Sequence, residues 1–323
     1  MTEFKGGIAV VTGGGTGMGR ELTRQLAAEG CHVAMCDISS EAMAETAALA
    51  LADAPTGIRV TSFVADVADP AALTAFRDHV IDAHSTGHIN LLFNNAGIGG
   101  GGSLVNDSVD EWDRVFAICW GGVYHGTRTF LPLLLAADAG HVVNTSSVNG
   151  FWACLGANGA HTAYSAAKFA VKGFTEALVV DFRQNAPHLR ASVVMPGHIG
   201  TSIAFNSGEA FGRNPKELDD EHVAQIRARL IRQGIDVSGA SDEDVRSGVL
   251  ARAEAFRDQA PTTAAQAAAI ILEGVRSDRW RILVGDDAHF LDSLVREDPE
   301  HAYEPEFMDR LAERGTFGFI PRS

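Results

Sequence analysis

The chain has 323 residues, of which 46% are hydrophobic, enough to form a large buried core. Its formal net charge of −15 argues against a nucleic-acid partner, because phosphates require a basic surface. No apolar run reaches the roughly 20 residues of a membrane-spanning helix, and Met1–Lys5 leads into a strand without a signal peptide. The four cysteines form no CxxC pair, which favours reduced thiols and a cytoplasmic location.

The first predicted elements are a buried strand over residues 7–12, a glycine-rich turn and a helix over 17–30. Leu22 and Leu26 recur at helical spacing before Gly30 ends the helix. Glycines between a strand and a helix let backbone amides approach a pyrophosphate, and the helix N-terminus adds partial positive charge. The sequence therefore predicts a dinucleotide-binding turn, whose cofactor-binding residues are Gly13, Gly15, Thr16, Gly17, Met18 and Gly19.

The second predicted strand, residues 32–36, is followed directly by Asp37, about twenty residues beyond the turn. An acidic side chain at this place accepts hydrogen bonds from the ribose hydroxyls of adenosine and repels a 2′-phosphate. Neither Thr16 nor Ile38 is a Lys or Arg that would welcome such a phosphate. We therefore predict that the cofactor is NAD rather than NADP, bound beside Asp37 and Ile38.

Strands and helices continue to alternate along the chain. Further strands are predicted over 58–65, 90–94, 140–145, 190–195 and 281–284, and further helices over 39–53, 70–84, 108–137, 161–186 and 262–276. This alternation is typical of an α/β protein with a Rossmann-like, doubly wound, mostly seven-stranded parallel sheet and helices on both faces. Such sheets bind ligands at the carboxyl ends of their strands.

Tyr164 and Lys168 lie four residues apart on the predicted helix over 161–186. Residues at this spacing share one face of a helix, so the ammonium group can lie beside the phenol. Adjacent positive charge lowers the pKa of a phenol from its usual value near 10. The pair therefore predicts a tyrosine that exchanges a proton with an alcohol near neutral pH.

In this order, the motifs resemble the short-chain dehydrogenase/reductase family, from about Ile8 to Thr201 and more loosely from Trp280 to Val284. The spacings Thr-Gly-x-x-x-Gly-x-Gly and Tyr-x-x-x-Lys fit the shorter-chain subtype of that family. The resemblance implies that Ser147 is the catalytic serine. It implies further cofactor contacts at Asp66, Val67, Asn94, Ala96, Gly97, Tyr164, Lys168, Pro196, Gly197, Ile199 and Thr201.

One position departs from the family pattern. Where the family has an asparagine whose main-chain carbonyl holds a proton-relay water, this chain has Cys119. Cysteine retains the carbonyl but lacks the amide side chain, which leaves the local helix geometry open, and we expect a working or slowed enzyme. A NAD-binding sensor or scaffold with impaired catalysis is the competing interpretation.

The predicted substrate-binding residues are Ser147, Trp152, Tyr164 and Phe205. Trp152 lies, with Phe151 and Leu155, in an unusually long segment between Ser147 and Tyr164. Phe205 belongs to a less patterned region over 202–260, which the resemblance implies is a substrate lid with amphipathic helices over 213–234 and 241–259. Its aromatic residues favour an apolar or bulky substrate, although any one of them could equally pack the lid onto the core.

Residues 1–298 are predicted to form a single dinucleotide-binding domain that includes the lid. Residues 299–323 form a C-terminal extension, whose apolar residues we expect to contact a neighbouring subunit in a dimer or tetramer: Tyr303, Phe307, Leu311, Phe317 and Phe319. The histidines include no HExxH pair, so no metal site is predicted.

The predicted function is that of an oxidoreductase that transfers a hydride between NAD and a secondary alcohol or ketone. Tyr164 acts as general acid/base, Ser147 binds the substrate oxygen and Lys168 activates the tyrosine. A 3-oxoacyl or sugar reductase of the same family is the alternative, although such enzymes commonly use NADP and Asp37 argues otherwise.

Overall fold

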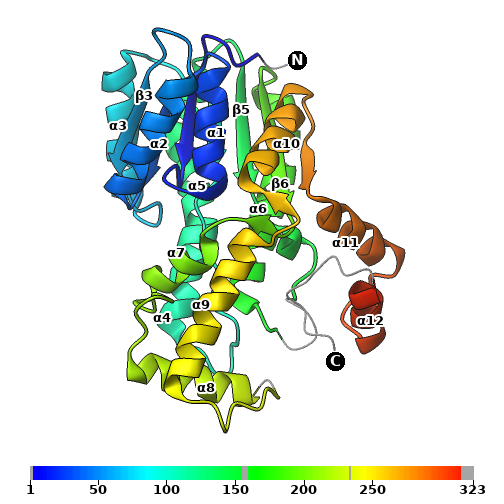
Figure 1. Ribbon diagram of the computed structural model, residues 1–323. Helices are drawn as coiled ribbons and strands as arrows, with labels where there is room; N and C mark the ends of the chain where they lie inside the picture. Colours follow the sequence, from blue (N-terminus) through cyan, green and yellow to red (C-terminus); the bar gives the residue numbers. More distant parts are fainter. Residues whose placement is uncertain (1–2, 155–158, 233, 314–323) are drawn as a thin grey trace.

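Seven parallel strands form the central sheet, in the order β3-β2-β1-β4-β5-β6-β9 (Figure 1). The computed structural model describes residues 3–154, 159–232 and 234–313. The strands are β1 (Ile8–Thr12), β2 (His32–Asp37), β3 (Val60–Val64), β4 (Leu91–Asn94), β5 (Gly140–Thr145), β6 (Leu189–Pro196) and β9 (Arg281–Val284). Every pair is parallel; for example, Val10 of β1 lies opposite Ala34 of β2 and Leu92 of β4.

Helices cover both faces of this sheet, which is why its central strands are continuous apolar runs rather than alternating ones. On one face lie α1 (Gly17–Ala28), α2 (Ser40–Asp53) and α10 (Ala264–Arg276). On the other lie α3 (Pro70–His84), α5 (Gly122–Leu135) and α6 (Thr162–Asn185). The predicted doubly wound α/β fold is confirmed.

The predicted helix over 108–137 is one helical rod with a widened middle. Its parts are α4 (Val109–Phe116), a π-helical segment η1 (Ala117–Gly121) and α5. Ser108 caps the rod, since its side chain accepts a hydrogen bond from the Glu111 amide. The π-helical turn inserts at Cys119, and such turns are frequent at functional sites.

The lid over residues 202–260 contains one more helix than predicted. Its helices are α7 (Ile203–Ala210), α8 (Asp220–Arg232) and α9 (Asp242–Asp258), and a short strand pair, β7 (Ile199–Gly200) with β8 (Thr262–Thr263), closes its base. Gly212, at φ +67°, follows the end of α7, and Pro215 delays the next helix, so α8 begins at Asp220 instead of near 213.

The C-terminal segment packs onto its own chain. It forms α11 (Asp286–Glu297) and α12 (Pro305–Glu313), which lie beyond the β9 edge of the sheet (Figure 1). Phe307 and Leu311 are buried against Val148 and Trp152, close to the short 3₁₀ turn η2 (Val148–Gly150). Phe307 and Leu311 are therefore covered by their own chain, and a subunit contact of this extension stays a prediction. Phe317 and Phe319 lie outside the described residues.

Within the described ranges, no helix has the length and apolar character needed to cross a membrane. In the same part of the chain, no three His, Cys, Asp or Glu side chains gather as potential metal ligands.

Candidate active site

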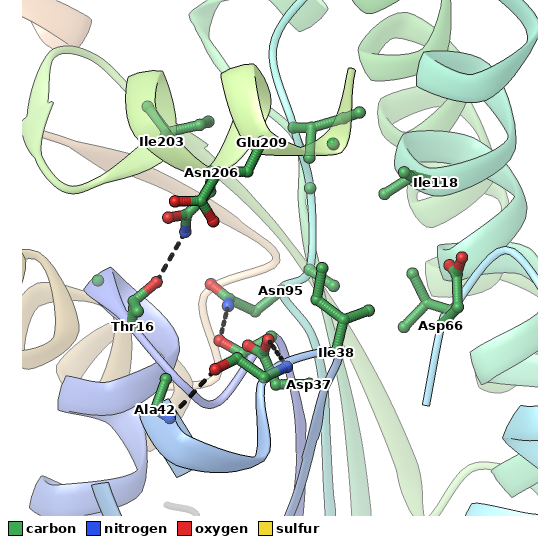
Figure 2. Close-up of a pocket in the computed structure, with 18 of the residues that line it drawn as sticks. Thr16, Asp37, Ile38, Ala42, Asp66, Asn95, Ile118, Ile203, Asn206 and Glu209 are labelled. Atoms are coloured by element: carbon green, nitrogen blue, oxygen red, sulfur yellow. Dashed lines mark hydrogen bonds between the residues drawn. The ribbon is translucent and has the colours of Figure 1, made fainter. Parts of the chain in front are cut away.

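A cavity of about 370 Å³ opens at the carboxyl edge of the sheet, where the strand order reverses between β1 and β4. Open α/β sheets bind ligands at this kind of switch point. Figure 2 shows the glycine turn and Asp37 on one side of the cavity and α7 on the other. Most of the predicted cofactor-binding residues line it: Gly13, Thr16, Gly17, Met18, Asp37, Ile38, Asp66, Val67, Ala96, Gly97 and Thr201.

The turn after β1 is shaped by contacts that require glycine. Gly13 has a φ of +67°, and a Cβ on it would lie 2.9 Å from the Cα of Ala96. A Cβ on Gly19 would collide with the carbonyl oxygen of Gly13. The neighbouring backbone therefore occupies the positions that side chains at Gly13 and Gly19 would need. The N-terminus of α1 borders the cavity. The backbone N–H groups of the glycine turn and of the N-terminus of α1 fit the pyrophosphate of a dinucleotide.

Asp37 ends β2 at the rim of the cavity. Its Oδ2 accepts a hydrogen bond of 2.9 Å from the Gly15 amide, and its Oδ1 accepts one of 3.1 Å from the Ser39 amide. These two bonds fix the carboxylate beside the glycine turn. Gly15 thus acts behind the cavity wall, by orienting Asp37, rather than as part of the lining.

Asp66 lies on the opposite wall, after β3. Its Oδ1 accepts a hydrogen bond from the Ala68 amide, and its Oδ2 forms an ion pair of 2.6 Å with Arg114 of α4. Arg114 also lines the cavity, although nothing in its spacing along the sequence marked it as a site residue. It is the one Lys or Arg among the described lining residues, and its charge is matched by Asp66.

The lid contributes a set of lining residues that the sequence reasoning missed. They belong to α7, which was not predicted as a helix, and they are Ile203, Asn206, Glu209 and Ala210. Asn206 Nδ2 donates a hydrogen bond of 2.9 Å to Thr16 Oγ1, so the lid touches the glycine turn directly (Figure 2). No local sequence signal could have joined two residues 190 positions apart.

Ser147, Tyr164 and Lys168 come together next to this cavity. Ser147 follows β5, and its Oγ accepts a hydrogen bond from the Asn149 amide. Tyr164 lies close enough to Ser147 for the two side chains to interact, and Lys168 Nζ lies 5.4 Å from the centre of the Tyr164 ring. Lys168 Nζ also donates a hydrogen bond of 2.8 Å to the carbonyl of Thr145. The three predicted catalytic side chains therefore form one group.

The electrostatics of this group differ from the expectation. Burial raises the pKa of Tyr164 above its usual value, nearby Cys119 adds to the rise, and the hydrogen bond with Ser147 opposes it. Burial likewise lowers the pKa of Lys168. The net direction for the phenol is opposite to the predicted lowering, because removal from water outweighs the effect of Ser147.

Cys119 lies within the π-helical segment and is a close neighbour of Tyr164. Its Sγ donates a hydrogen bond of 3.2 Å to the carbonyl of Ile98, and the residue is fully buried. The helix geometry at this position, which the sequence left open, is π-helical. Gly97 connects this region to the cavity, since a Cβ on it would lie 3.5 Å from Lys168 Nζ and 3.7 Å from Cys119 Sγ.

Eight predicted cofactor contacts lie outside the cavity lining: besides Gly15, Gly19, Tyr164 and Lys168, they are Asn94, Pro196, Gly197 and Ile199. Asn94 is 1% exposed, and its amide donates to Thr127 Oγ1 and Asn144 Oδ1, so it braces β4 against its neighbours. Ile199 points into the core. The loop at Gly197 packs against Asp287 of α11, whose carboxylate accepts a hydrogen bond from the His198 amide.

Two predicted substrate-binding side chains are buried instead of exposed to a pocket. Trp152 is 2% exposed; its Nε1 donates to the carbonyl of Ala302, and its ring packs 5.8 Å from that of Phe307. Phe205 is 7% exposed and lies beneath the charged groups of Lys216 and Arg257. Both side chains pack inside the wall or the lid, and neither lines the cavity described above. Leu155 lies outside the described residues.

Comparison with known proteins identifies the family. A family model for short chain dehydrogenases matches residues 7–210. The chain is 36% identical over 242 residues to the putative oxidoreductase SadH of Mycobacterium tuberculosis, and the alignment covers 73% of this chain and 84% of that one. The chain belongs to the short-chain dehydrogenase family and is an oxidoreductase of that family.

Solved structures show the same architecture. A short-chain dehydrogenase/reductase from Burkholderia phymatum, in complex with NAD, matches with a TM-score of 0.73 and 30% identity, over 94% of this chain and 98% of that one. A metagenomic short-chain oxidoreductase, in complex with NADP, matches with a TM-score of 0.54 and 32% identity, over 61% of this chain and 84% of that one. These matches agree with the Rossmann-like fold described above.

Proposed function

We propose that this chain transfers a hydride between a nicotinamide cofactor, NAD in preference to NADP, and a secondary alcohol or its ketone. The observation that carries the proposal is the grouping of Ser147 and Tyr164 with Lys168, whose Nζ lies 5.4 Å from the centre of the phenol ring. This group meets the cavity at Gly97. Proton exchange and cofactor binding can therefore take place side by side.

The lining of the cavity fits a dinucleotide. The glycine turn and the N-terminus of α1 would hold the pyrophosphate, and Asp37 would accept hydrogen bonds from the adenosine ribose. Asp37 is also the basis for the NAD preference, since its carboxylate repels a 2′-phosphate. Arg114 does not change this, because it is paired with Asp66 on the opposite wall. When bound, the nicotinamide ring supplies the hydride chemistry, and the protein orients it.

The residues of this chain supply the proton and the oxygen-binding site. Ser147 donates a hydrogen bond to the substrate oxygen and stabilises the negative charge that develops on it. Tyr164 gives its proton to that oxygen in ketone reduction and takes it back in alcohol oxidation. Since burial raises the pKa of the Tyr164 phenol, its hydroxyl is protonated at neutral pH and poised to donate. The Lys168 ammonium stabilises the phenolate that remains.

An apolar or bulky substrate fits the lid better than a sugar does. Ile203 lines the cavity, and Phe211 packs so closely on the loop after β4 that a Cβ on Gly100 would lie 2.9 Å from its ring. These apolar side chains offer no hydrogen-bonding partners for the hydroxyls of a sugar.

The test is turnover by Tyr164→Phe with NAD and a panel of secondary alcohols. Loss of the proton donor should lower kcat on the order of 100- to 10,000-fold, while NADH still binds, as followed by its fluorescence. Ser165→Ala is the matched control, because Ser165 lies on the next position of α6 and its buried hydroxyl has no partner among the described residues. Unchanged turnover by Tyr164→Phe would rule out the tyrosine as the acid/base. If the wild-type chain binds NAD but oxidises no alcohol, the sensor interpretation gains support instead.

A further inference from the structure

The lid helix α7 is fastened to both sides of the cavity. On one side, Asn206 Nδ2 donates to Thr16 Oγ1 in the glycine turn, at 2.9 Å. On the other, Ser207 Oγ accepts a hydrogen bond of 2.8 Å from the Gly99 amide, in the loop after β4. Two neighbouring residues of one helix thus join the loops that follow β1 and β4. Figure 2 shows Asn206 and Glu209 directed from α7 into the cavity.

Thr16 is well placed for a second role at this contact. It is the N-cap residue of α1, but its side chain makes no capping hydrogen bond. Its hydroxyl oxygen is instead the acceptor for Asn206. The amide of Asn206 therefore lies at the N-terminus of α1, beside the lining residues Gly17 and Met18, where a pyrophosphate would be held.

The charges around the cavity make a neutral donor important at this place. The described lining carries the acidic side chains Asp37, Asp66 and Glu209, and its single cation, Arg114, is paired with Asp66. A pyrophosphate must therefore be held by uncharged N–H and O–H groups. The Asn206 side chain has two N–H donors, and Thr16 takes only one of them.

We propose that Asn206 is a further cofactor-binding residue, whose amide bridges Thr16 and the pyrophosphate so that α7 closes on the cofactor's phosphates. This inference rests on the proposed nicotinamide cofactor. It also has a thermodynamic consequence: if the closed lid binds phosphate, then the phosphate stabilises the closed lid by the same factor. Loss of the Asn206 amide should weaken cofactor binding and speed cofactor release together.

The experiment measures Asn206→Ala against three probes, NAD, ADP and adenosine, by displacement of NADH fluorescence. A hydrogen bond to a charged group is lost, so the Kd for NAD and ADP should rise about tenfold, whereas the Kd for adenosine, which has no phosphate, should not change. Retained adenosine binding also shows that the variant is folded. Stopped-flow measurement should show NADH leaving the variant about tenfold faster.

Asn206→Asp separates phosphate binding from simple closure of the lid. A carboxylate of the same shape can still accept a hydrogen bond from the Thr16 hydroxyl, but it repels phosphate. We therefore expect Asn206→Asp to bind ADP more weakly than Asn206→Ala does. If Asn206→Asp binds ADP as the wild type does, the residue merely fastens α7 to the turn, and the proposal is wrong.

Ser207→Ala is the matched control. It removes the hydrogen bond between α7 and the Gly99 amide, on the side of the cavity away from the phosphates. It should affect adenosine and ADP equally. A selective loss of ADP binding in Ser207→Ala would assign the effect to lid position and overturn the role given to the Asn206 amide. Failure of the wild-type chain to bind NAD would instead remove the proposed function itself. If the wild-type chain binds NAD and turns over normally, but the Asn206 variants bind NAD and ADP as tightly as the wild type, only this inference is removed.

Discussion

At Asp37, one carboxylate is held by two backbone amides at the rim of the cavity, with the side chain of Ile38 beside it, 64% exposed. A fixed negative charge there disfavours a 2′-phosphate, whereas a neutral side chain would not. A substitution at Asp37 should therefore change the choice between the two cofactors more than the rate of the chemical step.

We predict that Asp37→Ala lowers the ratio of kcat/KM for NAD over NADP by about tenfold, and that adding Ile38→Arg reverses the preference by giving the phosphate a cation. Initial rates with each cofactor, at a saturating level of one alcohol, provide the measurement. Ile38→Leu is the control, since it keeps an apolar side chain at the rim. A cofactor preference that stays the same in the double variant would show that Asp37 is not the selector.

The site residues divide according to how far their partners lie along the chain. Asp37 and the Tyr164–Lys168 pair follow from short spacings, because a strand end and one helical turn are local features. Arg114 and Asn206 could not be found in this way, since their partners Asp66 and Thr16 become neighbours only through the fold. The raised pKa of Tyr164 is equally a property of burial, which spacing does not reveal.

Among the elements, α12 has the clearest consequence for the site. Its Phe307 ring packs against Trp152. The backbone of the segment that contains Trp152 is held by Asn149, whose side-chain amide donates to the carbonyls of Trp152 and Cys154. Asn149 in turn donates its backbone N–H to Ser147 Oγ. The C-terminal helix therefore supports the segment that begins at the proposed catalytic serine.

Phe307→Ala should loosen this support. Removal of a buried phenyl ring costs about 3–5 kcal/mol of local packing, so we expect faster amide hydrogen exchange at 148–154 and a KM for substrate raised several-fold, with cofactor binding unchanged. Tyr303→Phe, which removes only a hydroxyl on a half-exposed ring that contacts the Ala153 amide, is the milder comparison. Unchanged exchange at 148–154 would contradict the supporting role.

Two of the elements that sequence patterns missed, α7 and η1, share a physical cause. The regular helices around the sheet were predicted because each buries a periodic apolar face, and the central strands because each is a short apolar run. In contrast, α7 is short and begins without a side-chain cap, and η1 differs from an α-helix only in its hydrogen-bond spacing. Neither feature leaves a periodic signature. The capping box at Thr263 and Gln266 is, in contrast, visible in the sequence, and the predicted start of α10 is confirmed.

On the scale of the whole molecule, buried histidines link folding to pH. His84 is 2% exposed beside Thr61, and His141 is 1% exposed beside Ser192. Burial lowers the pKa of each imidazole from 6.5 to about 4. The unfolded chain therefore binds more protons than the folded one between these values. Stability is fully present above about pH 6.5 and is lost as the pH falls toward 4.

We predict that His141→Gln, which cannot titrate, flattens this dependence. The free energy of unfolding in urea should fall less between pH 7 and pH 4 than in the wild type, by up to about 3 kcal/mol. His88→Gln, at an exposed histidine, should leave the slope unaltered. Equal slopes for His141→Gln and the wild type would show that the imidazole of His141 does not remain neutral in the folded state.

Assembly and location stay predictions at this scale. A homo-oligomer, dimer or tetramer, and a cytoplasmic setting follow from the sequence reasoning alone. Light scattering on the intact chain, and on one truncated after Asp298, would show whether residues beyond Phe307 and Leu311 take part in subunit contacts.

The attachment of α12 to the segment after Ser147 also matters for changing what this enzyme accepts. The lid is one region to vary, but the segment that begins at Ser147 is backed by a helix more than 150 positions downstream of that residue. Variation at Phe307 or Met308 could reshape that backing without touching a single reacting group. A library that spans both regions should therefore recover altered selectivities that a lid-only library never samples.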